Sequence, residues 1–353
     1  MKHVVSFSGG RTSAYLVHLM EQKRKAEGLD VAYVYMDTGA EHPKTYAFIR
    51  NVVKHFGIEL ICLRADFNQP LGVGHSYKVV SIDDCCHDLG PFRDMCKKYG
   101  TPSIAGKWCS SKMKQEVHDK YCDDVFGKSS YVTWLGIRAD EPRRLTAIGK
   151  SEFVRYMAEI SDAEKCDVMS FWASMPFDLE IDEWLGNCVF CFKKSDLKLA
   201  AAQRDEPGLY ASWLQMIDGA PERVEQSKFR RSRHVMYRKR MRLEQVIAQF
   251  DGATGEEIKA RIRGAKMTYS GACSESCEVF NCQLDCLTNK NIEDKAMSFA
   301  QAFLTTSERD EAIAAYIKRG AKVKKDGARG LIVVRTRWES GSYSKAYSGK
   351  AGR

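Results

Sequence analysis

Cys188 and Cys191 are the clearest candidates for metal chemistry in this sequence, because only two residues separate them. That spacing lets both thiolates point at one metal ion or at one iron–sulfur cluster. Lys193 and Lys194 follow one residue later and place positive charge that could offset that of the thiolates. We therefore expect a metal or cluster site here. The alternative is that both cysteines are small buried hydrophobic side chains.

A second concentration of cysteines lies further along the chain. If this region is helical, Cys273 and Cys277 stand one turn apart on the same face. We expect these two to supply a further ligand to the same centre or to hold a zinc ion of their own, with burial in the core as the alternative. The other cysteines of this group are Cys282 and Cys286, and a further candidate set comprises Cys85, Cys86, His87 and Cys96.

The 13 cysteines are too few for a disulfide scaffold in a chain of 353 residues, and their number is odd. Clustered cysteines of this kind fit a reducing compartment, where they bind metal or react. No apolar run approaches the roughly 18 residues that cross a bilayer, and the first residues do not form a signal peptide. We therefore expect a cytoplasmic protein without a membrane partner.

The residues most suited to hold a phosphate group lie near the start of the chain. The motif SGGRTS comes between an apolar run at residues 3–7 and a helical pattern at residues 12–25. Glycines there let the backbone approach a ligand closely, and N–H groups at a helix N-terminus attract anions. The motif is not a Walker A loop, and the alternative is a plain strand-to-helix connection. The candidate residues are Ser8, Gly9, Gly10, Arg11, Thr12 and Ser13.

The elements that would position this loop alternate between strand and helix. Residues 31–36, 59–63 and 131–137 read as further buried strands, and residues 44–56 as a helix. This alternation predicts an α/β fold with a doubly wound, mostly parallel sheet, in which ligands bind at the carboxyl ends of the strands. The pattern at residues 69–124 is irregular, whereas residues 194–204 and the segments up to about residue 263 favour helices.

The sequence divides into three parts on this interpretation. Residues 1–200 form a nucleotide-binding α/β domain, and residues 201–288 form a helical region that is basic and rich in cysteine. Residues 289–353 form a small basic appendage, with a helix expected at residues 308–318 and a strand at residues 331–334. We expect no internal repeat.

Four motifs together resemble one family. They are SGGRTS at residues 8–13, DTGAEHP at residues 37–43, WCSSKMK at residues 108–114, and GIRADE at residues 136–141 followed by two arginines. A strand followed by SGGxxS and a second strand ending in DTGxExP resemble the PP-loop ATP pyrophosphatases. Within them, the GIRxxE and WCSSKMK motifs are similar to those of the phosphoadenosine phosphosulfate (PAPS) reductase family. The resemblance covers about residues 1–145 and fades towards residue 200.

The resemblance implies roles for individual residues. The SGGRTS loop would hold the phosphates of an adenine nucleotide, and Asp37, Thr38 and Gly39 would lie near its adenosine. Guanidinium groups clamp phosphate and sulfate through two parallel hydrogen bonds. The alternative for the last two arginines is a role in surface ion pairs. The candidate catalytic residues are Arg138, Arg143, Arg144 and Lys112.

Iron–sulfur members of the superfamily resemble this chain in combining one cysteine of the WCSSKMK type with a CxxC motif. The resemblance therefore adds Cys109 to Cys188 and Cys191 as expected ligands of a 4Fe-4S cluster, with zinc as the alternative. Three thiolates would leave one iron open for sulfide. Mg²⁺ is expected with the nucleotide.

Two departures from the family pattern bear on the reaction. ATP-cleaving members carry an acidic residue where Thr12 stands, so the handling of metal at the phosphates is open. PAPS-cleaving reductases carry a catalytic cysteine in a C-terminal ECGxH-type motif, and residues 287–353 contain no cysteine. We therefore expect ATP as the nucleotide, adenylation of a substrate, and sulfur transfer to it. The alternatives are a PAPS or adenosine phosphosulfate reductase that releases sulfite, and a nucleic-acid-binding protein without turnover.

Positive charge is concentrated in two places. Residues 290–353 carry 14 lysines and arginines against seven acidic residues, within a net charge of +9 for the whole chain. The stretch from Lys228 to Arg242 has eight basic residues and no acidic one. Both features suit a nucleic-acid partner, and the alternative is a solvated helix face with a solubilising tail. A nucleic-acid base is therefore our expected acceptor.

Overall fold

The computed structural model describes residues 1–70, 72–104, 106–142, 144–145, 151–220 and 235–264, together with three strands further on. The chain divides into two compact units, Met1–Gln283 and Leu284–Arg353. The three-part division expected from the sequence stays a prediction.

A six-stranded sheet forms the centre of the first unit, with the strand order β4-β3-β2-β1-β5-β6. Five of its strands run parallel, and β4 pairs antiparallel with β3. This arrangement confirms the predicted α/β fold with a mostly parallel sheet. The strands are β1 (Lys2–Ser6), β2 (Val31–Met36), β3 (Leu60–Asp66), β4 (Ser76–Val80), β5 (Tyr131–Leu135) and β6 (Val154–Tyr156).

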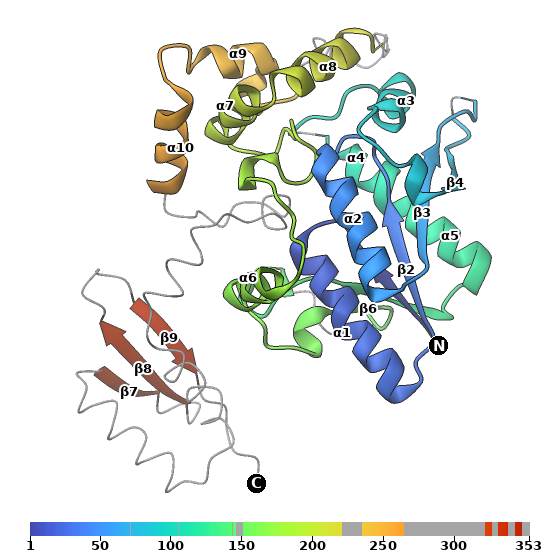
Figure 1. The fold of residues 1–353 in the computed structure, drawn as a ribbon, viewed down its shortest axis with the longest axis vertical. Helices are drawn as coiled ribbons and strands as arrows, with labels where there is room; N and C mark the ends of the chain where they lie inside the picture. Colours follow the sequence, from blue (N-terminus) through green and yellow to red (C-terminus); the bar gives the residue numbers. More distant parts are fainter. Residues whose placement is uncertain are drawn as a thin grey trace, which may run out of the picture. The chain divides into compact units, whose positions relative to one another are not determined.

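Helices cover both faces of this sheet. The helices α1 (Arg11–Glu27) and α2 (Pro43–Phe56) lie together on one face, and α5 (Glu116–Phe126) lies on the other (Figure 1). A crossover that joins two parallel strands of one sheet is almost always right-handed. The crossovers through α1 and α2 both lead toward β3, so their helices lie on the same face of the sheet. Both α1 and α2 end at a glycine with positive φ, Gly28 and Gly57, where a side chain would be strained. The helix α6 (Lys165–Ser174) packs against α1.

The region from residue 69 to residue 124, where the sequence pattern is irregular, contains regular structure that the pattern did not predict. This region contains β4, the helices α3 (Gly90–Tyr99) and α4 (Trp108–Ser110), a π-helical turn at Ser111–Gln115, and α5. The buried face of α5 carries His118, Tyr121 and Cys122 beside Val117. Because most of these side chains are not aliphatic, the helical period is weak in the sequence.

The described residues after α6 include four more α-helices: α7 (Asp196–Asp205), α8 (Pro207–Asp218), α9 (Leu243–Ala248) and α10 (Gly255–Gly264). They confirm the helical segments expected up to about residue 263. In the second unit the described strands β7 (Lys322–Asp326), β8 (Leu331–Arg337) and β9 (Tyr343–Tyr347) form an antiparallel sheet in that order. The strand expected at residues 331–334 lies within β8. The helix expected at residues 308–318 lies outside the described residues.

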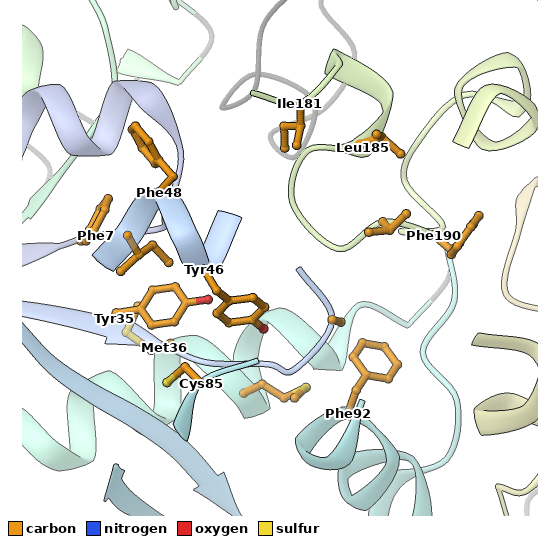
Figure 2. Close-up of a cluster of buried hydrophobic side chains, with 14 of the residues drawn as sticks. Phe7, Tyr35, Met36, Tyr46, Phe48, Cys85, Phe92, Ile181, Leu185 and Phe190 are labelled. Atoms are coloured by element: carbon orange, nitrogen blue, oxygen red, sulfur yellow. The ribbon is translucent and has the colours of Figure 1, made fainter. Parts of the chain in front are cut away.

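Large aromatic side chains fill the space between the sheet and its helices. Figure 2 shows Tyr35 of β2 beside Tyr46 of α2, and their rings meet edge to face with centroids 6.5 Å apart. Phe48 makes a similar contact with Trp172 of α6 at 4.9 Å. None of the helices in the described part of the chain is both long and apolar enough to cross a membrane.

A buried histidine links α2 to the helices that follow the sheet. His42 caps α2, because its Nδ1 accepts a hydrogen bond of 3.1 Å from the backbone N–H of Lys44. Its Nε2 must therefore carry the proton, and it donates to the carboxylate of Glu206 at 3.0 Å. His42 is only 4% exposed. Burial lowers the pKa of His42, and the Glu206 carboxylate opposes part of this effect.

We predict that His42 makes the stability of the protein depend on pH. Because its pKa is lower in the folded state than in the unfolded state, its stabilising contribution is complete above about pH 6.5 and is lost as the pH falls below that value. Chemical denaturation between pH 8 and pH 5 should show a steeper loss of unfolding free energy for the wild type than for His42→Asn, by up to about 1.4 kcal/mol per pH unit. Asparagine keeps the capping acceptor. Equal slopes for the two proteins would contradict the prediction.

Candidate active site

The SGGRTS loop joins the carboxyl end of β1 to the first turn of α1. Gly9 has a φ of +82°, and a Cβ there would lie 2.9 Å from the side chain of Ile49, so only glycine fits without strain. The Ser13 hydroxyl donates to the carbonyl of Gly10 at 3.0 Å and accepts from the N–H of Ser8 at 3.2 Å. These bonds fold the loop back on itself at the start of the helix.

Arg11, which we expected at the phosphates, has a different place. Its guanidinium forms a bidentate ion pair with Asp178, with N–O distances of 2.7 and 2.9 Å, and also donates to the carbonyl of Leu179. The indole N–H of Trp172 donates to the Arg11 carbonyl at 2.9 Å. Arg11 does not line the cavity that opens beside the SGGRTS loop. Its observed contacts fasten the loop to residues 172–179.

A cavity of about 240 Å³ opens beside this loop. Its walls come from six places in the sequence: the SGGRTS loop, the end of β2, Phe92 of α3, the helical segment with the WCSSKMK motif, the end of β5 with the GIRADE segment, and the CxxC loop. The lining residues include Ser8, Thr12, Ser13, Thr38, Phe92, Cys109, Ser110, Lys114, Gly136, Arg138, Glu141, Arg144, Cys188, Cys191 and Lys193.

Arginines from the GIRADE segment form one side of the cavity. Arg138 is 3% exposed, and its guanidinium contacts both the Thr12 hydroxyl at 3.2 Å and the Asp140 carboxylate at 2.8 Å. The Glu141 carboxylate accepts from the Arg138 backbone N–H at 2.8 Å and from the Arg144 guanidinium at 2.5 Å. The GIRADE segment and the residues after it therefore hold the guanidinium groups of Arg138 and Arg144 at the wall of the cavity. Arg143 lies outside the described residues.

Two of the three residues expected near an adenosine have structural contacts of their own. The Asp37 carboxylate is fully buried and accepts from Arg64 at 2.6 Å, from Tyr46 at 3.0 Å and from the Gly39 N–H at 2.9 Å. Burial raises the pKa of Asp37, and the nearby Glu41 carboxylate acts in the same direction. Neither Asp37 nor Gly39 lines the cavity, whereas Thr38 does.

Glu41 is a buried carboxylate that sequence reasoning did not select. It is 2% exposed and accepts hydrogen bonds from Thr38 at 2.6 Å and from Tyr46 at 3.2 Å. The Lys114 ammonium lies 3.5 Å from it. Its backbone also forms a bridge with Cys188. The glutamate of the DTGAE motif therefore connects the end of β2 to two other walls of the cavity.

The three cysteines expected as ligands line the same cavity. Cys109 comes from α4, and Cys188 and Cys191 come from the loop after residue 185. The Thr38 hydroxyl lies 3.9 Å from the Cys188 sulfur. Among the described residues, however, no three His, Cys, Asp or Glu side chains form a group that could hold a metal ion. Cysteine thiolates are ligands of both zinc ions and iron–sulfur clusters. Cys273 and Cys277 lie outside the described residues.

Lys112, expected among the catalytic residues, is placed beside the cavity and not in its lining. Its ammonium pairs with Glu116 at 2.5 Å and lies 5.6 Å from the centre of the Tyr99 ring. Lys114, two residues on, lines the cavity instead. Residues two apart on a helix point in different directions, and the π-helical turn sets which of the two faces inward.

The described end of the basic stretch contacts the CxxC loop. Arg238 donates to the backbone carbonyls of Lys193 and Lys194, and Tyr237 donates to that of Phe190. Within the loop, the buried Lys194 ammonium donates to the carbonyls of Trp184 and Val189. Sequence reasoning missed these contacts, because charge alone does not distinguish a cation that binds carbonyls from one that faces solvent. Residues 228–234 lie outside the described residues.

Comparison with known proteins gives two kinds of match. A family model for the phosphoadenosine phosphosulfate reductase domain matches residues 2–156. The uncharacterized nin region protein ORF290 of Escherichia phage lambda is 47% identical over 288 residues, which cover 81% of this chain and 97% of that protein. An uncharacterized protein of Methanocaldococcus jannaschii is 28% identical over 138 residues, 39% of this chain and 23% of that protein.

We predict that the close approach of β5 to the SGGRTS loop makes Gly136 intolerant of a side chain. A Cβ at Gly136 would lie 3.0 Å from the Cα of Ser13 and 3.2 Å from its N, and backbone cannot move aside as a side chain can. Gly136→Ala should lower the unfolding free energy by about 1–3 kcal/mol. The control is Gly208→Ala on α8, where a Cβ meets nothing within 4 Å; it should stabilise by about 0.5–1 kcal/mol. Denaturant titration measures both, and effects of equal size and sign would contradict the prediction.

Proposed function

The chain belongs to the PAPS reductase family of the PP-loop superfamily, and on that premise we propose that it binds ATP and adenylates a substrate for sulfur transfer. The SGGRTS loop would take the phosphates of the nucleotide. The cysteine side of the cavity would deliver the sulfur. The acceptor we propose is a base of a nucleic acid.

One observation carries this proposal. Ser8, Thr12 and Ser13 of the SGGRTS loop line the same cavity as three cysteines from two distant segments. A nucleotide bound by the loop would therefore have its reacting phosphate next to thiol chemistry. Holding reactants together in this way lowers the barrier because their translational and rotational freedom is already lost.

The first step would join the substrate to AMP. A carbonyl oxygen of the substrate attacks the α-phosphorus of ATP, an O–P bond forms, and the bond to the β-phosphate breaks, so pyrophosphate leaves. Negative charge develops on the phosphate oxygens and the leaving group. Arg138, Arg144 and Lys114 all line the cavity and would stabilise that charge, as would Mg²⁺ brought by the nucleotide.

The second step would replace the AMP oxygen by sulfur. A sulfide nucleophile attacks the activated carbon, a C–S bond forms, the C–O bond breaks, and AMP leaves with the electron pair. An iron–sulfur cluster held by Cys109, Cys188 and Cys191 would supply bound sulfide for this step. Lys193 lies at the same wall, 3.4 Å from the Ser110 hydroxyl, and contributes positive charge next to the thiolates.

Two features favour ATP over PAPS as the nucleotide. The loop keeps both of its glycines, and residues 287–353 contain no cysteine that could act as a C-terminal nucleophile in a reductase. The basic composition of residues 228–242 and 290–353 supports a polyanionic acceptor. Reduction of PAPS or adenosine phosphosulfate, and nucleic-acid binding without turnover, are distinct outcomes of the first test.

We predict that the protein binds a non-hydrolysable ATP analogue with Mg²⁺ more tightly than adenosine 3′,5′-bisphosphate. Anaerobic calorimetry measures both affinities without knowledge of the acceptor. Preference for the bisphosphate would overturn the proposal in favour of sulfonucleotide reduction. Binding of neither ligand would indicate a protein that catalyses neither adenylation nor sulfonucleotide reduction.

The matched pair Lys114→Gln and Lys112→Gln tests the location of the nucleotide. Both substitutions remove one positive charge from the same turn, but only Lys114 lines the cavity. Loss of one charge-assisted contact should weaken binding of the ATP analogue about tenfold for Lys114→Gln and leave it within about twofold for Lys112→Gln. Equal losses would mean that only the total charge matters.

We predict that anaerobic reconstitution with iron and sulfide gives a cluster that depends on the three lining cysteines. Cys109→Ser, Cys188→Ser and Cys191→Ser should each lose most of the visible absorption and the bound iron. The control is Cys86→Ser, since Cys86 is exposed and does not line the cavity. Retention of the cluster in all three variants, or binding of zinc alone, would contradict the cluster proposal.

A further inference from the structure

We propose that residues 236–238, here named the bracket segment, position both cysteine-bearing segments at the cavity. This part of the chain belongs to the stretch whose composition indicated nucleic-acid binding. The consequence for sulfur transfer rests on the proposed function, whereas the effect on the cysteines can be measured without it.

Arg238 holds the end of the CxxC loop. Its Nη2 donates to the carbonyl of Lys193 at 2.9 Å, and its Nη1 donates to the carbonyl of Lys194. These carbonyls lie two and three residues after Cys191 in the sequence. The planar guanidinium fork fixes two neighbouring acceptors in one geometry, which a single-point donor cannot do.

Tyr237 holds the loop between its two cysteines. Its hydroxyl donates to the carbonyl of Phe190 at 2.9 Å and accepts from the indole N–H of Trp213 at 3.1 Å. Tyr237 is 3% exposed. Burial raises the pKa of Tyr237, so the hydroxyl keeps its proton and remains a donor. Trp213 thus orients the hydroxyl, and the hydroxyl orients the loop.

Met236 reaches the other cysteine segment. Its carbonyl accepts from the backbone N–H of Ile104 at 3.1 Å. Residue 104 lies shortly before α4, which carries Cys109. The indole N–H of Trp108 at the start of α4 donates to the carbonyl of Gly100 at 3.1 Å, which links α4 to the end of α3. Three consecutive residues therefore contact the segments on both sides of the cavity.

The loop has hydrogen bonds of its own in addition to these outside contacts: the N–H of Cys191 donates to the carbonyl of Cys188 at 3.1 Å, and the N–H of Lys194 donates to that of Cys191 at 3.0 Å. Lys194 binds the carbonyl of Val189 from within the loop. The bracket segment adds donors to the carbonyls of Phe190, Lys193 and Lys194. A buried carbonyl that loses its donor must find another, so loss of the bracket should let the loop shift.

The test compares two variants with the same change in charge. Arg238→Gln removes the fork, whereas Arg240→Gln changes an exposed arginine two residues on. The rate at which iodoacetamide alkylates Cys191, measured by peptide mass spectrometry, reports the loop position. Cys86, which is exposed and distant in sequence, serves as the internal reference. We expect alkylation of Cys191 to rise about tenfold for Arg238→Gln and to stay unchanged for Arg240→Gln.

Two further variants separate positioning from loss of folding. Tyr237→Phe removes one oxygen and keeps the buried ring, so it should remain folded and still raise the alkylation rate. Arg238→Lys should restore part of the protection, because an ammonium can donate to one of the two carbonyls. The yield of a Cys109–Cys188 cross-link with dibromobimane should fall in Arg238→Gln and recover in Arg238→Lys.

Unchanged Cys191 alkylation and cross-linking in both Arg238→Gln and Tyr237→Phe would overturn the inference. Equal changes in Arg238→Gln and Arg240→Gln would also overturn it, because charge alone would then explain the effect. These readouts use the protein without nucleotide, cluster or acceptor. A failure of the proposed function would leave them intact, so the two failures are distinguishable.

Discussion

The arrangement of the cavity depends on one close backbone contact, between the loop after β2 and the CxxC loop. The backbone of Glu41 bridges that of Cys188, and the N–H of Val189 donates to the carbonyl of Ala40 at 3.1 Å. These residues are separated by about 150 positions in the sequence. The end of β2 already lies next to the end of β1 in the sheet. The contact therefore brings the cysteines of the CxxC loop close to the SGGRTS loop.

The buried charge around this contact explains why it is stable. Glu41 carries its carboxylate at 2% exposure, where an uncompensated charge would be costly. Thr38 and Tyr46 donate to it and Lys114 lies beside it, so the charge is both paired and hydrogen-bonded. Asp37 lies four residues before Glu41 and forms a separate ion pair with Arg64. Two carboxylates can then share a small buried region because each has its own cation.

Positive side chains serve two purposes in this protein. Arg138, Arg144 and Lys114 line the cavity. Arg11, Lys194 and Arg238 instead bind carboxylate or carbonyl groups and fix loops. The second group would look like ligand-binding residues in a sequence, because each stands next to a recognisable motif. In the described part of the chain, these three side chains fix loops and do not line the cavity.

The sequence by itself determined the parts of the protein that depend on local order. Alternating apolar runs and helical periods predicted β1 to β3, β5, α1 and α2, and motif spacing identified the SGGRTS, GIRADE and CxxC segments. It did not predict β4, α3 or α5, because an edge strand and helices with polar or aromatic buried faces give weak periodicity. Only the tertiary structure decided that Arg11 points to Asp178, that Lys114 and not Lys112 faces the cavity, and that Arg238 supports the cysteine loop. Such choices depend on which distant acceptor lies within hydrogen-bonding distance. Contacts between residues 167 positions apart, as for Arg11, or 45 positions apart, as for Arg238, leave no local pattern.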